Sequence, residues 1–463
     1  MRAAHGLLRF VSVAALSLAG CAGHGQDRPA WRVGLARAVI TPEEPVWLAG
    51  YGTKRVPEGK LHDLWLKVLA LEDSGGHRAV LITSDHMGMP REIYESLVRE
   101  LEARFRLGRS QVMLTFSHNH CGPRLRDDLV DFYPIDARQS ALVERYSDTV
   151  EAATIEAVGR ALGSLAPARL WMGEGETTFA VNRRENTEAD VAAGKPLKGV
   201  VDHAVPVLAI VEGPATSRPA EGALRGVLFG YACHPTTLSF NQWCGDYPGW
   251  AQLALEANHP GLTAAFFNAC GADANPIPRR QLALAEKYGR MLAEAVEQVL
   301  AGEMQPVATG LSTALEWVDL PYEKLVTRET LEPVANGQSA LHARWARRML
   351  KLIDQGVQFP TSYPYPVQAW RIGDELLLIA IGGEAVVDYA LRFKREYGPR
   401  AWVCGYANDM AAYIPSRRVW EEGGYEGGPH LDEYGRPAWR WAGDVEDRIA
   451  AAVHRVVAQT EAR

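Results

Sequence analysis

Short apolar runs alternate along this chain with longer stretches in which apolar residues recur at helical spacing. An apolar run bounded by polar residues, glycine or proline is typical of a buried strand, whereas the helical spacing indicates a helix that buries one face. The strands predicted in this way are residues 79–83, 112–115, 168–171, 205–211, 226–232, 264–267, 367–372, 376–381 and 401–404. The predicted helices are residues 92–105, 139–162, 250–257, 282–300, 338–352 and 445–457.

This alternation favours an α/β fold with a layered, mixed β-sheet core flanked by α-helices. We expect a single large domain over residues 31–463, because α/β folds of this size often form one domain. Residues 360–366 are rich in proline and tyrosine and are predicted to be a surface connection. Residues 420–441 combine glycine and aromatic residues with little periodicity, which predicts an ordered loop over a site.

The amino terminus has the layout of a secretory signal. Two arginines precede an apolar stretch at residues 11–18 that is too short to span a bilayer as a helix. Leu18-Ala19-Gly20-Cys21 resembles a bacterial lipobox, which implies cleavage before Cys21, lipidation of its sulfur, and a tether at residues 22–30. The alternative is a plain signal peptide with a chance cysteine. We therefore expect a cell-envelope lipoprotein, with Ala22 favouring the outer membrane, and a membrane contact through the lipid anchor.

Composition narrows the class of partner. The 463 residues are 47% hydrophobic and 23% charged, which suits a folded body with a large core. The net charge of −7 is spread along the chain without a basic block, so nothing favours nucleic acid. Besides Cys21 there are five cysteines, an odd number that excludes full internal pairing. They either pair in part or are small buried residues, at positions Cys121, Cys233, Cys244, Cys270 and Cys404.

Two histidines directly follow a predicted core strand. His118 and His120 lie in the run from Thr115 to Pro123, behind the apolar residues 112–114. On extended backbone, residues two apart point the same way, so both imidazoles should project together. Imidazole is a common metal ligand, and this pattern suits zinc or iron. The alternative is one solvated histidine and one hydrogen-bonded structural histidine.

Other polar residues stand where later predicted strands end. His234 follows the strand at 226–232, a small-residue loop follows the strand at 264–267, and Glu384 follows the strand at 376–381. A further segment, residues 405–413, ends in Tyr413. The ends of parallel strands are where α/β folds build their sites, so these groups are candidates for one centre. Individually, Glu384 could instead cap a helix and Tyr413 could belong to the core.

The order of the motifs resembles that of a known family. The motifs are Ile40-Thr41-Pro42, Gly50-Tyr51-Gly52, Leu61-His62-Asp63, Ser84-Asp85-His86-Met87, Ser117-His118-Asn119-His120-Cys121-Gly122-Pro123, Val181-Asn182-Arg183, Ala232-Cys233-His234-Pro235-Thr236, Gly245-Asp246, Gly383-Glu384, Gly405-Tyr406-Ala407-Asn408 and Tyr425-Glu426-Gly427. They resemble the amino-terminal catalytic domain of the neutral/alkaline (non-lysosomal) ceramidases. The resemblance implies a mononuclear zinc amidohydrolase that cleaves the linear amide of ceramide (N-acylsphingosine) or a related N-acyl lipid.

The resemblance also implies roles for single residues. It assigns one Zn²⁺ per chain to His118, His234, Glu384 and Tyr413, a set that leaves room for a water whose pKa the metal lowers. His120 would then lie beside the metal and move a proton or hydrogen-bond the oxyanion.

Three further residues receive roles around this centre. Arg183 and Tyr425 match positions that face the substrate and would stabilise the oxyanion or hold a substrate hydroxyl. Asp246 either hydrogen-bonds a ligand histidine from behind or caps a turn.

The chain departs from the family at several places. The family carries a serine in the small-residue loop where this chain has Ala274, so a mechanism that needs that hydroxyl is excluded. Two glycines after the histidine loop are Arg124 and Leu125 here, which should reshape the mouth of the pocket, and a proline before Gly383 is replaced by Gly382. We also expect no carboxy-terminal β-sandwich domain.

These departures leave alternatives open. One alternative is that the same metal site serves a non-lipid amide or ester, such as a sugar or cell-wall fragment. A barrel-type amidohydrolase also uses His-x-His on a strand, but eight regular βα units are not visible. A non-catalytic, ligand-binding lipoprotein is the remaining alternative. Metal content separates three classes of protein. One zinc per chain supports the ceramidase-like enzyme and equally the non-lipid hydrolase with the same site, two metals support the barrel-type amidohydrolase, and no metal supports the ligand-binding lipoprotein.

Overall fold

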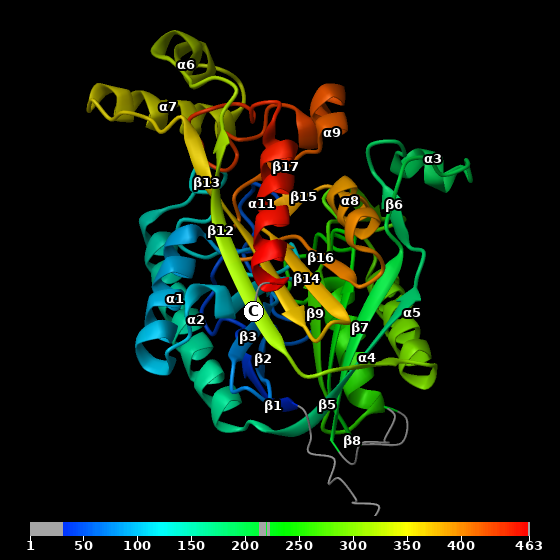
Figure 1. Cartoon of the computed structure of the whole chain (residues 1–463). Helices are drawn as coiled ribbons and strands as arrows, with labels where there is room; N and C mark the ends of the chain where they lie inside the picture. Colours follow the sequence, from blue (N-terminus) through cyan, green and yellow to red (C-terminus); the bar gives the residue numbers. More distant parts are fainter. Residues whose placement is uncertain (1–30, 213–218, 220–222, 462–463) are drawn as a thin grey trace, which may run out of the picture.

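The fold is an α/β/β/α arrangement of two packed sheets between helical layers (Figure 1). The computed structural model describes residues 31–212, 219 and 223–461. The expected signal peptide, Cys21 and the tether lie outside these residues. No helix among the described residues has the length and apolar character needed to cross a membrane.

The larger sheet has nine strands, eight of them in the order β4-β3-β2-β1-β5-β7-β8-β9, with β11 paired to β5. Most of its strands are buried on both faces, which explains their nearly continuous apolar sequences. The strands are β1 (Trp31–Val39), β2 (Trp65–Glu72), β3 (Arg78–Ser84), β4 (Val112–Phe116), β5 (Ala166–Glu176), β7 (Ala204–Glu212), β8 (Ala223–Tyr231), β9 (Thr263–Asn268) and β11 (Gln305–Val307).

The smaller sheet has the order β12-β13-β14-β16. A core cluster that includes Trp31 of β1 and Trp370 of β13 joins the two sheets face to face. The strands are β12 (Leu311–Pro321), β13 (Ser362–Ile372), β14 (Leu376–Ile381) and β16 (Ala401–Cys404). Two short ladders lie apart from both sheets: β6 (Ala180–Asn182) with β10 (Ala274–Pro276), and β15 (Glu384–Ala385) with β17 (Tyr413–Ile414).

Helices cover the outer face of each sheet, and each helical layer closes a separate apolar core. On the larger sheet these are α1 (Arg91–Phe105), α2 (Ala137–Gly163), α4 (Asp246–Asn258) and α5 (Leu282–Ala301), and on the smaller sheet α8 (Val387–Tyr397) and α11 (Val445–Glu461). The remaining helices are η1 (Arg109–Gln111), α3 (Glu188–Ala192), α6 (Arg328–Ala335), α7 (Ala340–Asp354), α9 (Arg417–Glu422) and α10 (Gly424–Gly427). Helices α6 and α7 form a projecting hairpin with a core of its own (Figure 1).

All nine predicted strands and all six predicted helices are present, and the α/β class is confirmed. The prediction of a surface connection at residues 360–366 is wrong, because β13 begins at Ser362 and pairs with β12 along its whole length. Its prolines are tolerated because β14 pairs with β13 only from Val367 onward. The residues before Val367 therefore lie on an edge of the sheet. On an edge, the N–H group that proline lacks is not needed for a hydrogen bond to a neighbouring strand.

The parallel strand pairs bring the predicted site segments to one place. Strands β3 and β4, β8 and β9, and β14 and β16 are parallel pairs. Bridges from Thr115 to Ala407 and from Ala269 to Cys404 tie the carboxyl ends of β4, β9 and β16 together between the two sheets. The five cysteines after Cys21 are all buried and free, and the backbone N–H of Cys244 donates to the carbonyl of Cys121.

Candidate metal centre

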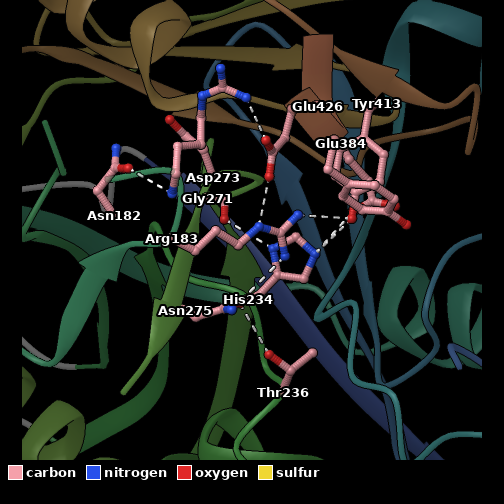
Figure 2. A network of polar contacts seen from close by, with 12 residues as sticks. Asn182, Arg183, His234, Thr236, Gly271, Asp273, Asn275, Glu384, Tyr413 and Glu426 are labelled. Atoms are coloured by element: carbon pink, nitrogen blue, oxygen red, sulfur yellow. Dashed lines mark hydrogen bonds and ion pairs between the residues drawn. The ribbon is translucent and has the colours of Figure 1, made fainter. Parts of the chain in front are cut away.

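Four predicted side chains converge where the strands end. The Nε2 atoms of His118 and His234 lie 3.2 and 2.9 Å from the same carboxylate oxygen, Oε2 of Glu384. The phenolic oxygen of Tyr413 lies 3.5 Å from Nε2 of His234 (Figure 2). All four residues are buried. The structure therefore brings together two imidazole nitrogens, a carboxylate and a phenol from four separate segments.

Hydrogen bonds behind His118 and His234 fix how their rings point. Nδ1 of His118 lies 2.6 Å from the carbonyl of Met87, and Nδ1 of His234 lies 3.0 Å from that of Gly271. A carbonyl only accepts, so the proton is assigned to Nδ1 in both rings and the Nε2 lone pair faces the centre. Burial lowers the pKa of His234 to about 4, which keeps that ring in the neutral form that binds metals.

The backbone at His118 differs from the predicted extended conformation. β4 ends at Phe116, and His118 has a φ of 63°, a left-handed conformation that few residues other than glycine adopt. A hydrogen bond from its N–H to the carbonyl of His86 accompanies this turn. His118 and His120 therefore approach each other through a tight turn, with Nε2 atoms 3.3 Å apart, and the strand-alternation argument is wrong in detail.

Glu384 and Tyr413 meet because they are register partners in the short parallel ladder of β15 and β17. The other carboxylate oxygen, Oε1 of Glu384, accepts a hydrogen bond from the phenol of Tyr434. The carboxylate is thus held from one side by the phenol of Tyr434 and faces His118 and His234 on the other.

His120 lies beside this cluster and differs from the other two histidines. The three imidazoles offer ligand atoms that all lie within 4.8 Å of one another. However, Nδ1 of His120 is buried and has no hydrogen-bond partner among the described residues. Burial, together with His118, lowers the pKa of His120 well below its usual value. Its ring is held by packing against Tyr51 and against the backbone of Gly50.

Gly50 is needed for the position of His120. Its φ is 105°, and a Cβ added there would lie 2.4 Å from the ring of His120. We expect Gly50→Ala to lower turnover by about 10²-fold, the scale of a lost proton-transfer group, while metal content stays at the wild-type value. Kinetics and metal analysis of the same preparation measure both. Gly52→Ala is the matched control, since Gly52 also has a positive φ but its added Cβ would face Phe132. Parallel loss of bound metal in Gly50→Ala would instead make His120 a ligand.

Arg183 and Tyr425 lie on the open side of the cluster. Nη2 of Arg183 donates to the phenolic oxygen of Tyr413 at 3.1 Å, and its Nε donates to Glu426 at 2.7 Å (Figure 2). Tyr425 is 49% exposed, and its ring centroid lies 5.0 Å from that of Tyr413. Its hydroxyl donates to Glu433. Both residues are therefore in reach of a molecule that approaches the centre.

A cavity of about 790 Å³ opens onto the cluster. His120, His234 and Tyr413 contribute to its lining, as do Arg183 and Tyr425. His118 and Glu384 are not part of the lining. A substrate in the cavity would thus meet the open side of the candidate metal centre.

Asp246 has the second of its two expected roles, that of holding a turn, and Arg124 does not have the position expected from the sequence. The carboxylate of Asp246 accepts hydrogen bonds from the backbone N–H groups of Leu238 and Tyr247, so it holds the turn before α4. Because carbonyls occupy Nδ1 of both predicted ligand histidines, its expected role behind a histidine is wrong. Arg124 is buried, with its guanidinium over the ring of Tyr133, and does not reshape the cavity mouth.

Sequence reasoning missed three residues at the centre. Tyr434 donates to Glu384, and the ring of Tyr406 packs 4.5 Å from that of His118. The side chain of Asn275 lines the cavity and accepts from Arg183 at 3.4 Å, whereas its neighbour Ala274 does not line the cavity. Tyr406 belongs to the motif Gly405-Tyr406-Ala407-Asn408, and Asn275 follows Ala274 in the small-residue loop after the strand at 264–267, which was the available signal. Tyr434 lies in residues 420–441, where only the loop as a whole was predicted.

The fold and the cluster define an α/β protein with a buried histidine–carboxylate centre, able to hold a metal, at one end of a cavity. The chain belongs to the neutral/alkaline non-lysosomal ceramidase family, whose amino-terminal domain it matches over residues 31–310. Over 474 aligned residues it is 22% identical to the neutral ceramidase of Pseudomonas aeruginosa, and the alignment covers 87% of this chain and 69% of that protein. The predicted class of enzyme, a ceramidase-like amidohydrolase, is confirmed by this membership.

Solved structures show the same fold. The crystal structure of the neutral ceramidase from Pseudomonas aeruginosa superposes with a TM-score of 0.72 at 19% identity, over 94% of this chain and 75% of that chain. A ceramidase complexed with C2 gives a TM-score of 0.70 at 18% identity, over 94% of this chain and 76% of that chain.

Proposed function

We propose that the protein uses one zinc ion to hydrolyse the amide bond of ceramide or a related N-acyl substrate. The observation that carries this proposal is the convergence of His118, His234, Glu384 and Tyr413 beside a cavity. Family membership supports the amide as the bond that is cleaved. A similar structure that was solved with C2 supports a lipid-like substrate.

The donor set fits a cation. With Nδ1 protonated in His118 and His234, both Nε2 lone pairs face the carboxyl oxygen Oε2 of Glu384. Three electron-rich atoms at such distances repel one another unless positive charge lies between them. Two imidazole nitrogens and two oxygens are a suitable set for zinc in tetrahedral geometry.

The hydrogen bonds of the rings support His118 and His234, and not His120, as the ligand histidines. A ligating histidine almost always donates its second N–H to a carbonyl, carboxylate or water. His118 and His234 have such carbonyl partners, whereas His120 has none among the described residues. His120 therefore acts beside the metal.

The bound zinc would lower the pKa of a coordinated water towards neutrality and polarise the amide carbonyl. His120 lines the cavity and accepts or returns the proton that the reaction moves. The guanidinium of Arg183 stabilises negative charge on Tyr413 and on the substrate oxygen. When substrate binds at the cavity mouth, the hydroxyl of Tyr425 gives up its hydrogen bond to Glu433 and donates to the substrate instead.

Zinc analysis tests the proposed function directly. We expect about one zinc per purified chain, loss of amidase activity on removal with a chelator, and recovery on addition of zinc. Release of free amine from N-acetylsphingosine measures the activity. Full activity of the metal-free protein, or two metals per chain, would contradict the proposal.

Tyr425→Phe separates a substrate contact from a metal ligand. We expect turnover to fall by about 10-fold to 10²-fold, since one hydrogen-bond donor to the reacting substrate is lost. Zinc content should remain that of the wild type, as measured by elemental analysis. An equal loss of zinc and turnover would place Tyr425 on the metal.

We further propose, from the lipobox-like sequence alone, that Cys21 is lipidated and anchors the enzyme in the cell envelope. Mass spectrometry of the protein from membranes tests this, since Cys21→Ser should lack the lipid and leave the membrane fraction.

A further inference from the structure

We infer that Arg348 of α7 is a positioning residue for the reaction, because it fixes the segment that carries Tyr434 to Glu384. The inference rests on the proposed function and concerns how the carboxylate of the candidate metal centre is held in place. Arg348 does not line the cavity that opens onto the centre. It therefore acts on the reaction through Tyr434 and not through the substrate.

The segment of residues 430–436 supports two of the four converging side chains. The phenol of Tyr434 donates to Oε1 of Glu384, and Nε2 of His430 lies 3.3 Å from the carbonyl of Tyr413. The segment consists of turns and has no helix or strand of its own. Because ordering such a segment costs conformational entropy, contacts from outside are needed to hold one conformation. The position of the phenol thus depends on what holds the backbone beside it.

Arg348 ties this backbone to a second segment. Its Nη2 donates at 3.1 Å to the carbonyl of Gly435, directly beside Tyr434. Its Nε lies 2.9 and 2.8 Å from the two carboxylate oxygens of Asp131, and its Nη2 donates to the same carboxylate. The planar fork of a guanidinium lets one side chain bind a carboxylate and a carbonyl together. Since Asp131 is buried, this bridge is fixed at one end.

The second segment, residues 131–133, belongs to the other side of the centre. Arg344, which is also in α7, donates to two backbone carbonyls of this segment at 2.9 Å each. The phenolic oxygen of Tyr133 accepts from the N–H of Gly50, whose backbone packs against the ring of His120. The bridge therefore joins the support of the carboxylate to the support of the third histidine.

Packing beside the bridge is incomplete. A cavity of about 410 Å³ lies there, and Val130, Arg348, Tyr434 and Gly435 all contribute to its lining. Gly435 has a φ of 70°, and a Cβ added to it would lie 2.8 Å from Nη2 of Arg348. The glycine thus permits the close approach of the guanidinium. Because side chains do not fill the space, the hydrogen bonds of Arg348 contribute more to the positioning.

The rest of α7 keeps the guanidinium in place. Trp345 is fully buried, its Nε1 donates to the carbonyl of Arg436 at 2.9 Å, and its ring centroid lies 4.5 Å from that of Trp439. Nδ1 of His342 contacts the carboxylate of Asp432. The α6–α7 hairpin, which projects from the body with a core of its own, therefore acts as a brace for the segment (Figure 1).

Arg348→Met tests the inference on the zinc-loaded protein. We expect kcat for N-acetylsphingosine to fall by about 10-fold to 10²-fold, the range for loss of a residue that orients a metal ligand. KM should stay within about threefold, because the substrate cavity is unchanged. Arg347→Met is the matched control, since this neighbouring arginine donates to the carbonyl of Ala335 within the hairpin. Its replacement should leave both constants unchanged.

Two further variants test the bridge and its route. Arg348→Lys keeps the positive charge but lacks the fork, so its kcat should fall nearly as far as that of Arg348→Met. Full recovery with lysine would overturn the inference, because charge alone would then suffice. In a Tyr434→Phe background, Arg348→Met should lower kcat by less than about threefold more, since both changes affect one contact. Independent losses that multiply would equally contradict it.

Hydrogen exchange of the protein without added zinc gives a readout that does not depend on turnover. The N–H groups of residues 433–436 donate to carbonyls within the segment, so their exchange reports its opening. We expect about tenfold faster exchange in Arg348→Met and wild-type exchange in Arg347→Met. Unchanged exchange in Arg348→Met, or faster exchange with unchanged kcat, would overturn the inference. Absence of amidase activity in the wild type would overturn the proposed function, and exchange would still decide whether Arg348 holds the segment.

Discussion

Replacing His234 with alanine should remove zinc and turnover together. The variant loses one of the two imidazole nitrogens that face Glu384, and the carbonyl of Gly271 loses its donor. We expect activity to fall to about 10⁻³ of the wild-type value or less, because the proposed hydrolysis depends on the metal. Elemental analysis and amine release on the same preparation give both quantities, and circular dichroism shows whether the fold is kept.

His259→Ala is a suitable control for this variant. His259 is partly exposed at the end of α4 and pairs with Glu297, away from the cluster. Its removal should leave zinc content and turnover unchanged. Full activity of His234→Ala without bound metal would remove the proposed role of the centre.

The sequence predicts the position of a candidate-site residue only where that residue directly follows a recognisable strand. His118 and His234 follow apolar strands, so their position at strand ends could be predicted from periodicity. The meeting of Glu384 with Tyr413 depends on a parallel ladder of two residues per strand, which leaves no periodic pattern. Tyr434 reaches Glu384 from an irregular segment, and no local rule predicts which side chain of such a segment points inward.

The strands of the fold show the same difference between positions that periodicity predicts and positions that depend on tertiary pairing. Strands such as β4 and β14 are continuous apolar runs and were predicted almost to the residue. β1 and β12 were missed because polar and small residues interrupt their apolar positions, and partial burial of β12 against α11 does not require an apolar run. β13 was predicted only from Val367 because its prolines indicated a loop, whereas β12 alone pairs with that part of the strand. Tertiary pairing decided these cases over local propensity.

The second large effect is expected for Arg183→Met. Arg183 is the residue whose guanidinium touches both the phenol of Tyr413 and the carboxylate of Glu426. Methionine keeps much of the side-chain volume but removes the positive charge beside the phenolic oxygen. We expect turnover to fall by about 10²-fold to 10³-fold, as for loss of an oxyanion-stabilising donor, and zinc affinity to weaken because phenolate is less stable without the cation.

Arg184→Met separates this effect from a general loss of charge in the cavity. Arg184 also pairs with Glu426 at 2.7 Å and lines the same wall, but its hydrogen bonds go to Glu426, Glu422 and Gly423, and not to Tyr413. Its replacement should lower turnover by less than about tenfold and leave zinc affinity unchanged, since Glu426 keeps its ion pair with Arg183 and Arg184 does not contact Tyr413. Equal effects of the two variants would mean that the shared carboxylate matters and that contact with Tyr413 does not. A large effect confined to Arg183→Met would place its positive charge in the reaction itself.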